Sequence, residues 1–500
     1  MERASLAGAT RAQSPAAHLR EARGTFNRVL AGRSLGVEDS RMAEFRHRSR
    51  IEVSADELFD WHTRPGVLER LIPPWMSVKV LEPEDGVRAG GRVALRVGKT
   101  PFASRWVLEH RDLFERRQFC DVQIAGPFAH WSHTHRFTPD CDGAVLEDLI
   151  DYQLPLGVIG RVLIGRRVRR SLRRAFRFRH ARLRNDLRRH ARFAEHGPLR
   201  VAISGVSGLV GRSLAAFLTS GGHRVDRLVR RRPPTEGREI YWNPATGEID
   251  AAALEGVDAV VHLAGENVAS GRWNAARKAA IRSSRVDGTR LLCKALASLS
   301  AKPRVLVAAS AVGYYGERGD EWLDERSTPG TGFLPETCQA WEAATRPASD
   351  AGIRVAQLRI GVVFSPSGGA LQKMLTPFRL GLGGVLGSGR QFMSWISLDD
   401  LVGAIHHALF RRTVQGPINA VAPSPVTNAE FTKTLGRVLG RPTILPAPAA
   451  AVRVMFGEMG RTLLLEGAQV RPDRLLGDGF EFLHPNLDDA LRAELGLFPA

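Results

Sequence analysis

The chain has little cysteine and no long apolar run. Its 500 residues include 4 cysteines, and these are Cys120, Cys141, Cys293 and Cys338. Their wide spacing excludes the paired patterns of zinc and dithiol sites and is typical of reduced thiols in a cytoplasmic protein. No apolar segment approaches the roughly 18 residues of a membrane span. We therefore expect a cytoplasmic location, no transmembrane segment and no metal site.

The start of the chain lacks the apolar core of a secretory signal. It is rich in Ala, Arg and Ser, and we expect a disordered basic tail over residues 1–43. An arginine-rich transit peptide is the alternative, and the acidic residues of this stretch count against it, namely Glu2, Glu21, Glu38 and Asp39.

Lysine is also scarce, although the formal net charge is +19. Much of the excess comes from arginines between Arg161 and Arg192. Val168, Leu172 and Phe176 recur there at helical spacing, which predicts a long helix with arginines on a solvated outer face. A nucleic-acid or anionic-membrane surface is the alternative. Because few aromatic residues interleave with the arginines, we do not expect a nucleic-acid partner.

Several β-prone runs, the first over residues 45–53 and the last over 144–152, precede this helix. Ser54 and Glu57 form a capping-box pattern at the start of a short helix between them. The order predicts an α+β helix-grip domain over residues 44–192. With the motifs of residues 61–66 and 71–75, it resembles the START-like (SRPBCC) superfamily. That resemblance implies an apolar cavity that takes an apolar ligand.

Three histidines of this domain raise the alternative of a metal site, because His133 and His135 fall on one strand face and His130 lies close by. No carboxylate or cysteine nearby in the sequence completes a ligand set, so we do not expect one. Four aromatic residues are candidates for the core or the cavity wall, namely Trp106, Phe128, Trp131 and Phe137.

A glycine-rich turn then separates a strand-like run, residues 199–204, from a helical pattern. The spacing G-x-x-G-x-x-G in this context predicts a dinucleotide site, in which backbone amides approach a diphosphate at a helix N-terminus. An ordinary structural turn is the alternative. The predicted cofactor-binding residues here are Gly205, Ser207, Gly208, Leu209, Val210 and Gly211.

Strand and helix patterns alternate from residue 198 onward, which predicts an α/β Rossmann-like doubly wound parallel sheet over residues 198–440. Its second strand ends at Val229 and leads into Arg230 and Arg231, where an NAD site usually has a carboxylate. Guanidinium groups suit a 2′-phosphate, so NADP(H) is preferred over NAD(H). An exposed loop is the alternative. A further strand ends at cofactor-binding candidates Leu263, Ala264 and Gly265.

This half of the chain resembles the atypical, extended short-chain dehydrogenase/reductases, and more narrowly the epimerase family labelled YfcH-like. The resemblance rests on residues 262–267, 284–289, 310–316, 341–342, 387–391, 394–401 and 416–423. Residues 471–485 resemble that family's small C-terminal module, to which we assign 441–500. The fusion of a helix-grip domain to this unit recurs in the family. The resemblance implies oxidoreductase or epimerase chemistry on a small-molecule substrate.

The catalytic pair of that superfamily is missing. Leu334 and Cys338 stand where the Tyr and Lys of Y-x-x-x-K belong, and of the catalytic set only Ser310 remains, or Ala311 if the alignment shifts by one residue. Tyr314 is the candidate substitute proton donor, unless it only packs a turn. Cys338 as a nucleophile lacks a basic partner in the sequence. The candidate substrate residues are Arg285, Gln391 and Trp395.

Two functions from different classes remain open. The first is an NADP-binding oxidoreductase or epimerase-like enzyme. The second is a non-catalytic NADP-binding sensor, which the missing pair favours. We interpret Asp399 and Asp400 as helix-dipole partners rather than catalytic groups, and the glycine-rich residues 381–389 as a mobile loop beside the substrate cleft. The sequence identifies neither the substrate nor the oligomeric state.

Overall fold

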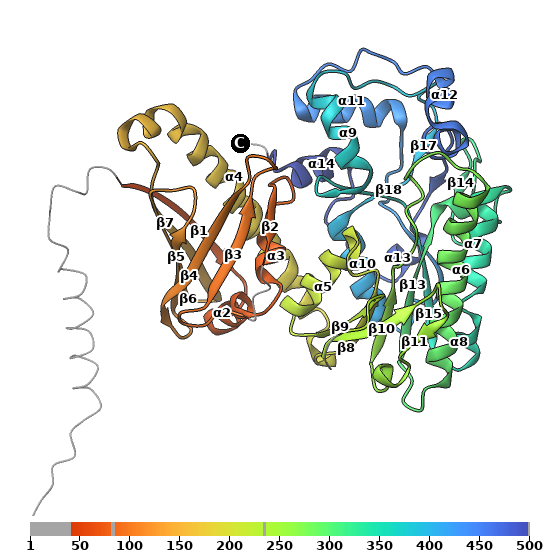
Figure 1. Cartoon of the computed structure of the whole chain (residues 1–500), viewed down its shortest axis with the longest axis horizontal. Helices are drawn as coiled ribbons and strands as arrows, with labels where there is room; N and C mark the ends of the chain where they lie inside the picture. The colour runs from red at the N-terminus through yellow and green to blue at the C-terminus, as the bar shows by residue number, and fades with distance from the viewer. Residues whose placement is uncertain (1–41, 82–85, 234–236, 499–500) are drawn as a thin grey trace, which may run out of the picture.

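A computed structural model describes residues 42–81, 86–233 and 237–498 of the chain. Apart from its last two residues, the predicted tail over residues 1–43 lies outside the described residues. Figure 1 shows two sheets side by side, with a long helix, α4, and short helices between them. No helix of the described part is long and apolar enough to cross a membrane.

The N-terminal sheet is antiparallel, as the sequence predicts, and its seven strands follow the order β1-β7-β6-β5-β4-β3-β2. β1 lies at an edge, and α2 (Ala55–Thr63) and α3 (Val67–Leu71) follow it. Ser54 caps α2 by accepting a hydrogen bond from the Glu57 amide, 3.1 Å away. The strands are β1 (Ala43–Ile51), β2 (Val78–Val80), β3 (Arg92–Val97), β4 (Ser104–Phe114), β5 (Gln118–Ala125), β6 (His130–Asp140) and β7 (Gly143–Gln153).

The arginine-rich helix α4 (Gly157–Ala191) packs Phe176, Leu183 and Leu187 against this sheet and its short helices. The prediction of a solvated outer face holds for most of its arginines and fails for some near its C-terminal end. Toward its C-terminal end, Arg182 Nη2 lies 2.5 Å from Asp399 Oδ2 and Arg189 Nη2 lies 2.9 Å from Asp400 Oδ1. The prediction was wrong for this end because carboxylates more than 200 residues away in sequence neutralise these arginines.

The second sheet has eight strands in the order β11-β10-β9-β8-β12-β13-β15-β19. All of its pairs are parallel except β10 with β11 at one edge. This confirms the doubly wound parallel sheet. The strands are β8 (Arg200–Ser204), β9 (Arg224–Val229), β10 (Glu239–Asn243), β11 (Glu248–Ile249), β12 (Ala259–His262), β13 (Val305–Ala311), β15 (Arg354–Ile360) and β19 (Gly416–Ala420).

Helices cover both faces of this sheet, which places its core in two layers. One layer joins the strands to α5 (Leu209–Ser220) and α10 (Leu398–Phe410). The other joins them to α6 (Ala275–Ser298) and α8 (Arg346–Asp350), and α7 (Phe333–Ala343) packs beside α6. As a result, the N-terminus of α5 lies at the carboxyl end of the central strands.

The C-terminal part packs onto this second sheet's unit. α14 (Leu487–Leu495) shares an apolar core with α9 (Gly369–Arg379) and α11 (Asn428–Leu439). Three small two-stranded sheets complete the fold, pairing β14 (Trp322–Leu323) with β21 (Gln469–Val470), β16 (Val362–Ser365) with β18 (Trp395–Ser397), and β17 (Phe392–Met393) with β20 (Val426–Thr427). The remaining helices are α12 (Ala449–Gly460) and α13 (Asp473–Gly477).

Candidate functional site

The glycine turn fits tightly against the end of a neighbouring strand. Gly205 directly follows β8 with a φ of +74°, and a Cβ atom there would lie 2.8 Å from the Ala264 nitrogen. A Cβ at Gly211 would lie 2.3 Å from the Gly205 oxygen. Only glycine therefore fits at either position. The turn, Leu263 and Ala264 meet where β8 and β12 lie side by side.

The N-terminus of α5 presents backbone amide donors at this place. Gly208 is its N-cap, no side chain caps it, and Ser207 and Gly208 are both exposed. The first amides of a helix have no partner within the helix, and they favour anions. The chain also changes direction across the sheet between β8 and β12, which is where doubly wound folds bind dinucleotides. The described residues thus fit a diphosphate.

Two arginines stand at the end of the adjacent strand. Arg230 and Arg231 follow β9, are exposed, and make no hydrogen bond or ion pair with any residue that the structure describes. The carboxylate of the same strand, Asp226, is buried and accepts a hydrogen bond from Arg200 Nε at 2.6 Å. Asp226 is therefore occupied, and the end of β9 offers only cationic groups.

A series of buried polar side chains, joined by hydrogen bonds, lies next to the turn. Ser204 Oγ lies 2.6 Å from His262 Nδ1, and His262 Nε2 lies 2.9 Å from Thr289 Oγ1. Trp341 Nε1 also donates to Thr289 Oγ1, at 2.9 Å. Burial lowers the pKa of His262 to about 4, so its ring is neutral at physiological pH. We infer that this series of side chains fixes the ends of β8 and β12 relative to each other.

Ser310 takes part in an ion-pair network. Its hydroxyl donates to Glu342 Oε1 at 2.7 Å, and Arg359 holds both oxygens of that carboxylate at 2.9 Å. Ser310 is only 3% exposed. Burial opposes the charge of Arg359, but Glu342 holds the pKa of this guanidinium above its ordinary value. The Ser310 hydroxyl is therefore committed to Glu342.

The two adjacent tyrosines differ in their surroundings. Tyr315 is fully buried, its hydroxyl donates to Asn419 Oδ1 at 2.7 Å, and burial raises its pKa to about 12. Tyr314 is half-buried, and the Arg359 guanidinium lies 3.5 Å from the centre of its ring. Its hydroxyl has no hydrogen bond to a described residue. Tyr314 thus has the free hydroxyl of the pair.

The two residues that the sequence alignment puts at the positions of the catalytic pair lie together near the predicted crevice. Leu334 and Cys338 of α7 both face Gly313, just beyond the end of β13. Burial raises the pKa of Cys338 to about 12, which argues against a nucleophile. Arg285 of α6 lies next to Gly265: a Cβ there would lie 3.4 Å from the guanidinium carbon. Arg285 Nη1 donates to the backbone oxygen of Glu266, 3.0 Å away.

Two substrate candidates have structural partners. Gln391 Nε2 donates to the backbone oxygens of Leu386 and Leu464, at 3.0 and 2.8 Å. Trp395 is fully buried, stacks on Phe364 with ring centres 5.5 Å apart, and donates through Nε1 to the Ser424 oxygen. Trp395 therefore belongs to the core, because its ring completes the packing between β18 and β16.

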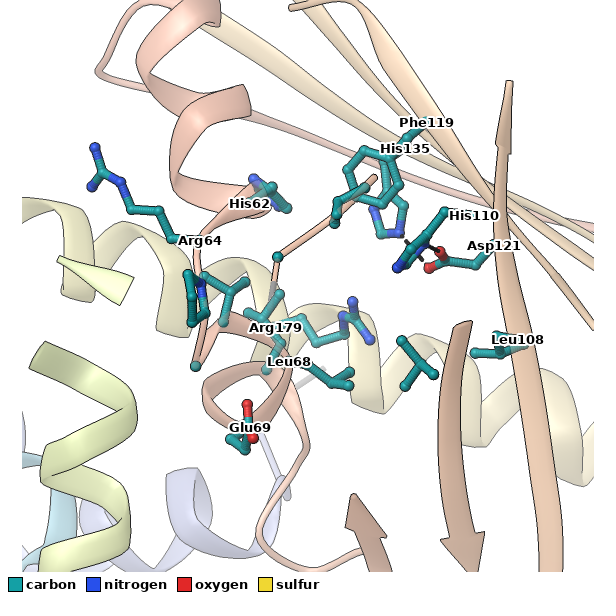
Figure 2. Close-up of a pocket in the computed structure, with 17 residues that line it drawn as sticks. His62, Arg64, Leu68, Glu69, Leu108, His110, Phe119, Asp121, His135 and Arg179 are labelled. Atoms are coloured by element: carbon teal, nitrogen blue, oxygen red, sulfur yellow. Dashed lines mark hydrogen bonds and ion pairs between the residues drawn. The ribbon is translucent and has the colours of Figure 1, made fainter. Parts of the chain in front are cut away.

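The N-terminal sheet encloses a small cavity with a polar wall. Its free space is about 50 Å³, room for a few water molecules. Figure 2 shows His62, His110, His135, Asp121 and Arg179 around this space, while Arg64 points away from it. Apolar side chains complete the lining, among them Val67, Leu68, Leu71, Val93, Leu108 and Phe119. The sequence leads us to expect an apolar cavity, whereas one wall carries charge.

That polar wall continues into a chain of histidines and aspartates. His110 Nδ1 lies 2.7 Å from Asp121 Oδ1, and His135 lies between Asp121 and Asp148, at 3.2 and 2.8 Å. Burial alone would lower the pKa of His135, but these two carboxylates raise it above its ordinary value. The two carboxylates thus favour the protonated form of His135.

The same chain brings a carboxylate to the histidines that the sequence analysis considered as metal ligands. Ligand atoms of Asp121, His133 and His135 lie within 4.8 Å of one another in the described part of the chain, whereas His130 is exposed. The expectation that no carboxylate accompanies them was wrong, because Asp121 comes from the neighbouring strand β5. Both nitrogens of His135 face carboxylates, which a proton satisfies without a metal.

Comparison with known proteins decides the family. The profile of the NAD dependent epimerase/dehydratase family matches residues 201–420. An epimerase family protein of Mycobacterium bovis is 49% identical over 291 residues, 58% of this chain and 96% of that protein. The chain belongs to the epimerase family. A human epimerase family protein, SDR39U1, is 41% identical over 297 residues, 59% of this chain and 99% of its own length.

Solved structures of epimerase family proteins match as well. A nucleoside-diphosphate sugar epimerase from Corynebacterium glutamicum matches 91% of this chain and 90% of its own, with a TM-score of 0.76 and 34% identity. Human SDR39U1, solved with NADPH, matches 59% of this chain and 99% of its own, with a TM-score of 0.55 and 38% identity.

Two further profiles match the flanking parts of this epimerase family member. Polyketide cyclase / dehydrase and lipid transport matches residues 51–177, and a domain of unknown function matches residues 447–494. The chain is thus an NAD(P)-binding epimerase family protein with an N-terminal domain of the polyketide cyclase and lipid-transport type.

Proposed function

We propose that this protein binds NADP(H) in preference to NAD(H). The observation that supports this proposal is the exposed pair Arg230 and Arg231 at the end of β9, beside the uncapped N-terminus of α5. Amides from Ser207 to Gly211 would hold the diphosphate, and the arginines would hold the 2′-phosphate. The NADPH in the structure of human SDR39U1 supports this preference.

The test is a titration of the purified full chain with NADPH and with NADH. Charge-assisted hydrogen bonds are each worth about 1.5–3 kcal/mol, so R230Q/R231Q should weaken NADPH binding at least about tenfold and leave NADH binding unchanged. R238Q, which changes an exposed arginine next to β10, is the matched control. Equal affinity of the unchanged chain for both nucleotides would contradict the proposal.

We further propose that the protein is an oxidoreductase that acts on a small carbonyl compound. The bound nucleotide supplies hydride chemistry. Tyr314 then holds a proton at a hydroxyl without a partner among the described residues. Arg285 provides positive charge beside Cys338, at the place of the missing lysine, and positions rather than reacts.

Turnover measurements test the role of Tyr314. A positioned proton donor contributes about 10²–10⁴-fold. In a screen of carbonyl compounds with NADPH, Tyr314→Phe should therefore lower kcat about a hundredfold while NADPH affinity stays the same. Tyr241→Phe, which changes a half-buried tyrosine on β10, is the control. Unchanged turnover in Tyr314→Phe removes the assigned role.

The second candidate is a nucleotide-binding sensor without turnover. The commitment of the Ser310 hydroxyl to Glu342 favours it, as do Leu334 and Cys338 in place of the catalytic pair. In this case NADPH binds with the same arginine dependence, but no carbonyl compound is reduced. The titration and the turnover screen together separate the two candidates.

For the N-terminal domain we propose a ligand with an apolar tail and a carboxylate or carbonyl head. Arg179 lines the cavity, and its guanidinium has no hydrogen bond or ion pair with a described residue. The small free space admits the head group, so the tail would lie along the apolar lining at the mouth. Octanoate should bind and octanol should not, and Arg179→Gln should abolish the difference. Arg188→Gln, on an exposed side of α4, is the control.

A further inference from the structure

The first turns of α4 expose a group of apolar side chains, which we call the apolar tip. Its six members are each between 44 and 78% exposed, and they are Leu156, Val158, Ile159, Val162, Leu163 and Ile164. In Figure 1 this end of α4 projects beyond the sheet. Contiguous apolar surface of this kind marks an interaction site.

A basic hollow lies further along the same helix. Arg169, Arg173 and Arg177 of α4 line it together with Arg46 and His47 of β1, and its volume is about 330 Å³. No carboxylate belongs to its lining, although Arg46 lies 3.5 Å from Glu44 and 3.8 Å from Glu147 beside it. Arg169 and Arg173 have no ion pair with a described residue. The hollow therefore suits a phosphate group.

The tip and the hollow share one side of the helix. Val158, Val162, Arg166, Arg169 and Arg173 follow one another at spacings of three or four residues, so their side chains lie in a row. The row begins apolar and ends basic. A helix whose apolar end is inserted in a membrane has its surroundings in this order, with acyl chains around its first residues and lipid phosphates around the residues that follow.

We propose that α4 docks this protein on an anionic phospholipid bilayer. The apolar tip inserts among the acyl chains, and the basic hollow takes up the phosphate of a lipid head group. A nucleic acid would match the arginines but leave the apolar tip in water. A second copy of the chain would bring arginine rows of like charge together, and the net charge of +19 adds to that repulsion.

Flotation of the full chain with vesicles tests this proposal. We expect binding to vesicles of phosphatidylglycerol and phosphatidylcholine in equal parts, weak binding to phosphatidylcholine alone, and release by salt. V162D/L163D should weaken binding more than about tenfold. R169Q/R173Q should weaken binding to the anionic vesicles about 30-fold, since each arginine near such a surface contributes about a factor of five.

The controls separate docking from general effects of charge and fold. Val454→Asp changes a valine of α12 that is 73% exposed, close to the 75% of Val162, and should leave vesicle binding unchanged. Circular dichroism and NADPH binding check that each variant is folded. Equal binding to both vesicle types, or binding that V162D/L163D does not reduce, would overturn the proposal.

Two further results would overturn the proposal, because each would assign the patch to a different partner. Duplex DNA that binds more tightly than the anionic vesicles, with no effect of V162D/L163D, would assign the arginines to nucleic acid. A dimer in light scattering that V162D/L163D dissociates, without any vesicle binding, would assign the tip to a second copy.

Discussion

Arg70 of α3 is a cation buried where the two halves of the chain meet. Its Nη2 and Nε atoms lie 2.6 and 2.7 Å from the oxygens of Asp186 on α4, and its Nη1 lies 3.4 Å from Asp399 on α10. Burial alone would lower the pKa of Arg70, but the two carboxylates hold it above its ordinary value. Nη1 also donates to Ser213 Oγ of α5 at 3.1 Å, so this guanidinium joins α3 to three other helices.

Removal of this guanidinium should be costly. Arg70→Met leaves Asp186 and Asp399 buried with less positive charge, and breaking a buried pair from one side typically costs about 3–5 kcal/mol. We expect a loss of this size in urea denaturation. Arg92→Gln breaks a surface pair with Glu109 and should cost far less than Arg70→Met, because solvent screens exposed pairs. Similar losses in the two variants would contradict the assignment.

The cysteines should differ sharply in reactivity. Burial raises the pKa of Cys293 and of Cys338 to about 12, whereas Cys141 is exposed in the turn between β6 and β7. Since the thiolate is the reactive form, iodoacetamide at pH 8 should label Cys141 and leave the other two unmodified in the native protein. Mass spectrometry of digests checks this. Rapid labelling of Cys338 would reopen the nucleophile hypothesis.

Residues whose role depends on local sequence were predictable, and those with distant partners were not. Gly205 was predictable as a turn because its strand and helix neighbours are adjacent in sequence. Trp395 was interpreted as a substrate residue because it follows a glycine-rich stretch. Its place in the core depends on Phe364 and Ser424, about 30 residues away on either side, and no spacing in the sequence reveals such partners.

At the scale of elements, α10 begins with two carboxylates that do more than match the helix dipole. Asp400 accepts hydrogen bonds from the amides of Leu483 and His484, at 2.7 and 3.0 Å, and from Arg189 of α4. It thereby ties the segment before α14 to the start of α10. The dipole interpretation accounts only for its place at the N-terminus.

Asp400→Ala should loosen that segment. With the acceptor gone, the Leu483 and His484 amides lose their partners, and Arg189 loses a neutralising charge. We expect faster hydrogen exchange at residues 483–484 and a loss of about 3–5 kcal/mol in unfolding free energy. Asp489→Ala, at an exposed position near the start of α14, is the control and should change neither quantity.

The histidine–aspartate chain illustrates what strand patterns leave open. Alternation placed His133 and His135 on one face of β6, and the structure agrees. Their partners Asp121 and Asp148 depend on register: Asp121 is paired with His133, and His135 with Asp148. A shift of one residue would send either carboxylate to the other face of the sheet, so the sequence alone could not assemble the chain.

At the scale of the whole molecule, three histidines meet between its halves. His190 ends α4, His223 precedes β9, and His406 lies on α10, with ring centres between 5.3 and 5.9 Å apart. Burial lowers the pKa of His190 to about 3 and of His223 to about 4, and that of His406 falls well below its ordinary value. His223 Nδ1 accepts from the Leu199 amide, so this ring holds its proton at Nε2 and does not suit a metal.

These shifts predict a dependence of stability on pH. Because the unfolded histidines take up protons near pH 6.5 and burial lowers the pKa of all three folded rings, the folded chain should lose stability as pH falls below about 6.5. His406→Leu keeps an apolar group among Phe193, Phe217 and Phe410 and removes one titrating ring. Its urea midpoint should fall less between pH 7 and pH 5. An identical fall in both proteins would contradict this origin.

The overall architecture could be predicted from the sequence because local periodicity indicates the strands and helices of each unit. The alternation of strands and helices predicted the doubly wound sheet, and the order of short strands and a long helix predicted the helix-grip domain. The way the two halves join was not predictable, because Arg70, Asp399 and the three histidines come from elements spread over more than 300 residues.

The fit between His190 and Gly221 bears on how this fusion holds together. A Cβ at Gly221 would lie 2.1 Å from the His190 ring, which also stacks on Phe217 at 4.1 Å. The C-terminal end of α4 thus fits closely into a recess on the other half of the chain. We therefore expect two fragments that are produced separately, with the chain divided between residues 192 and 199, to associate and form the native interface without a peptide bond between them.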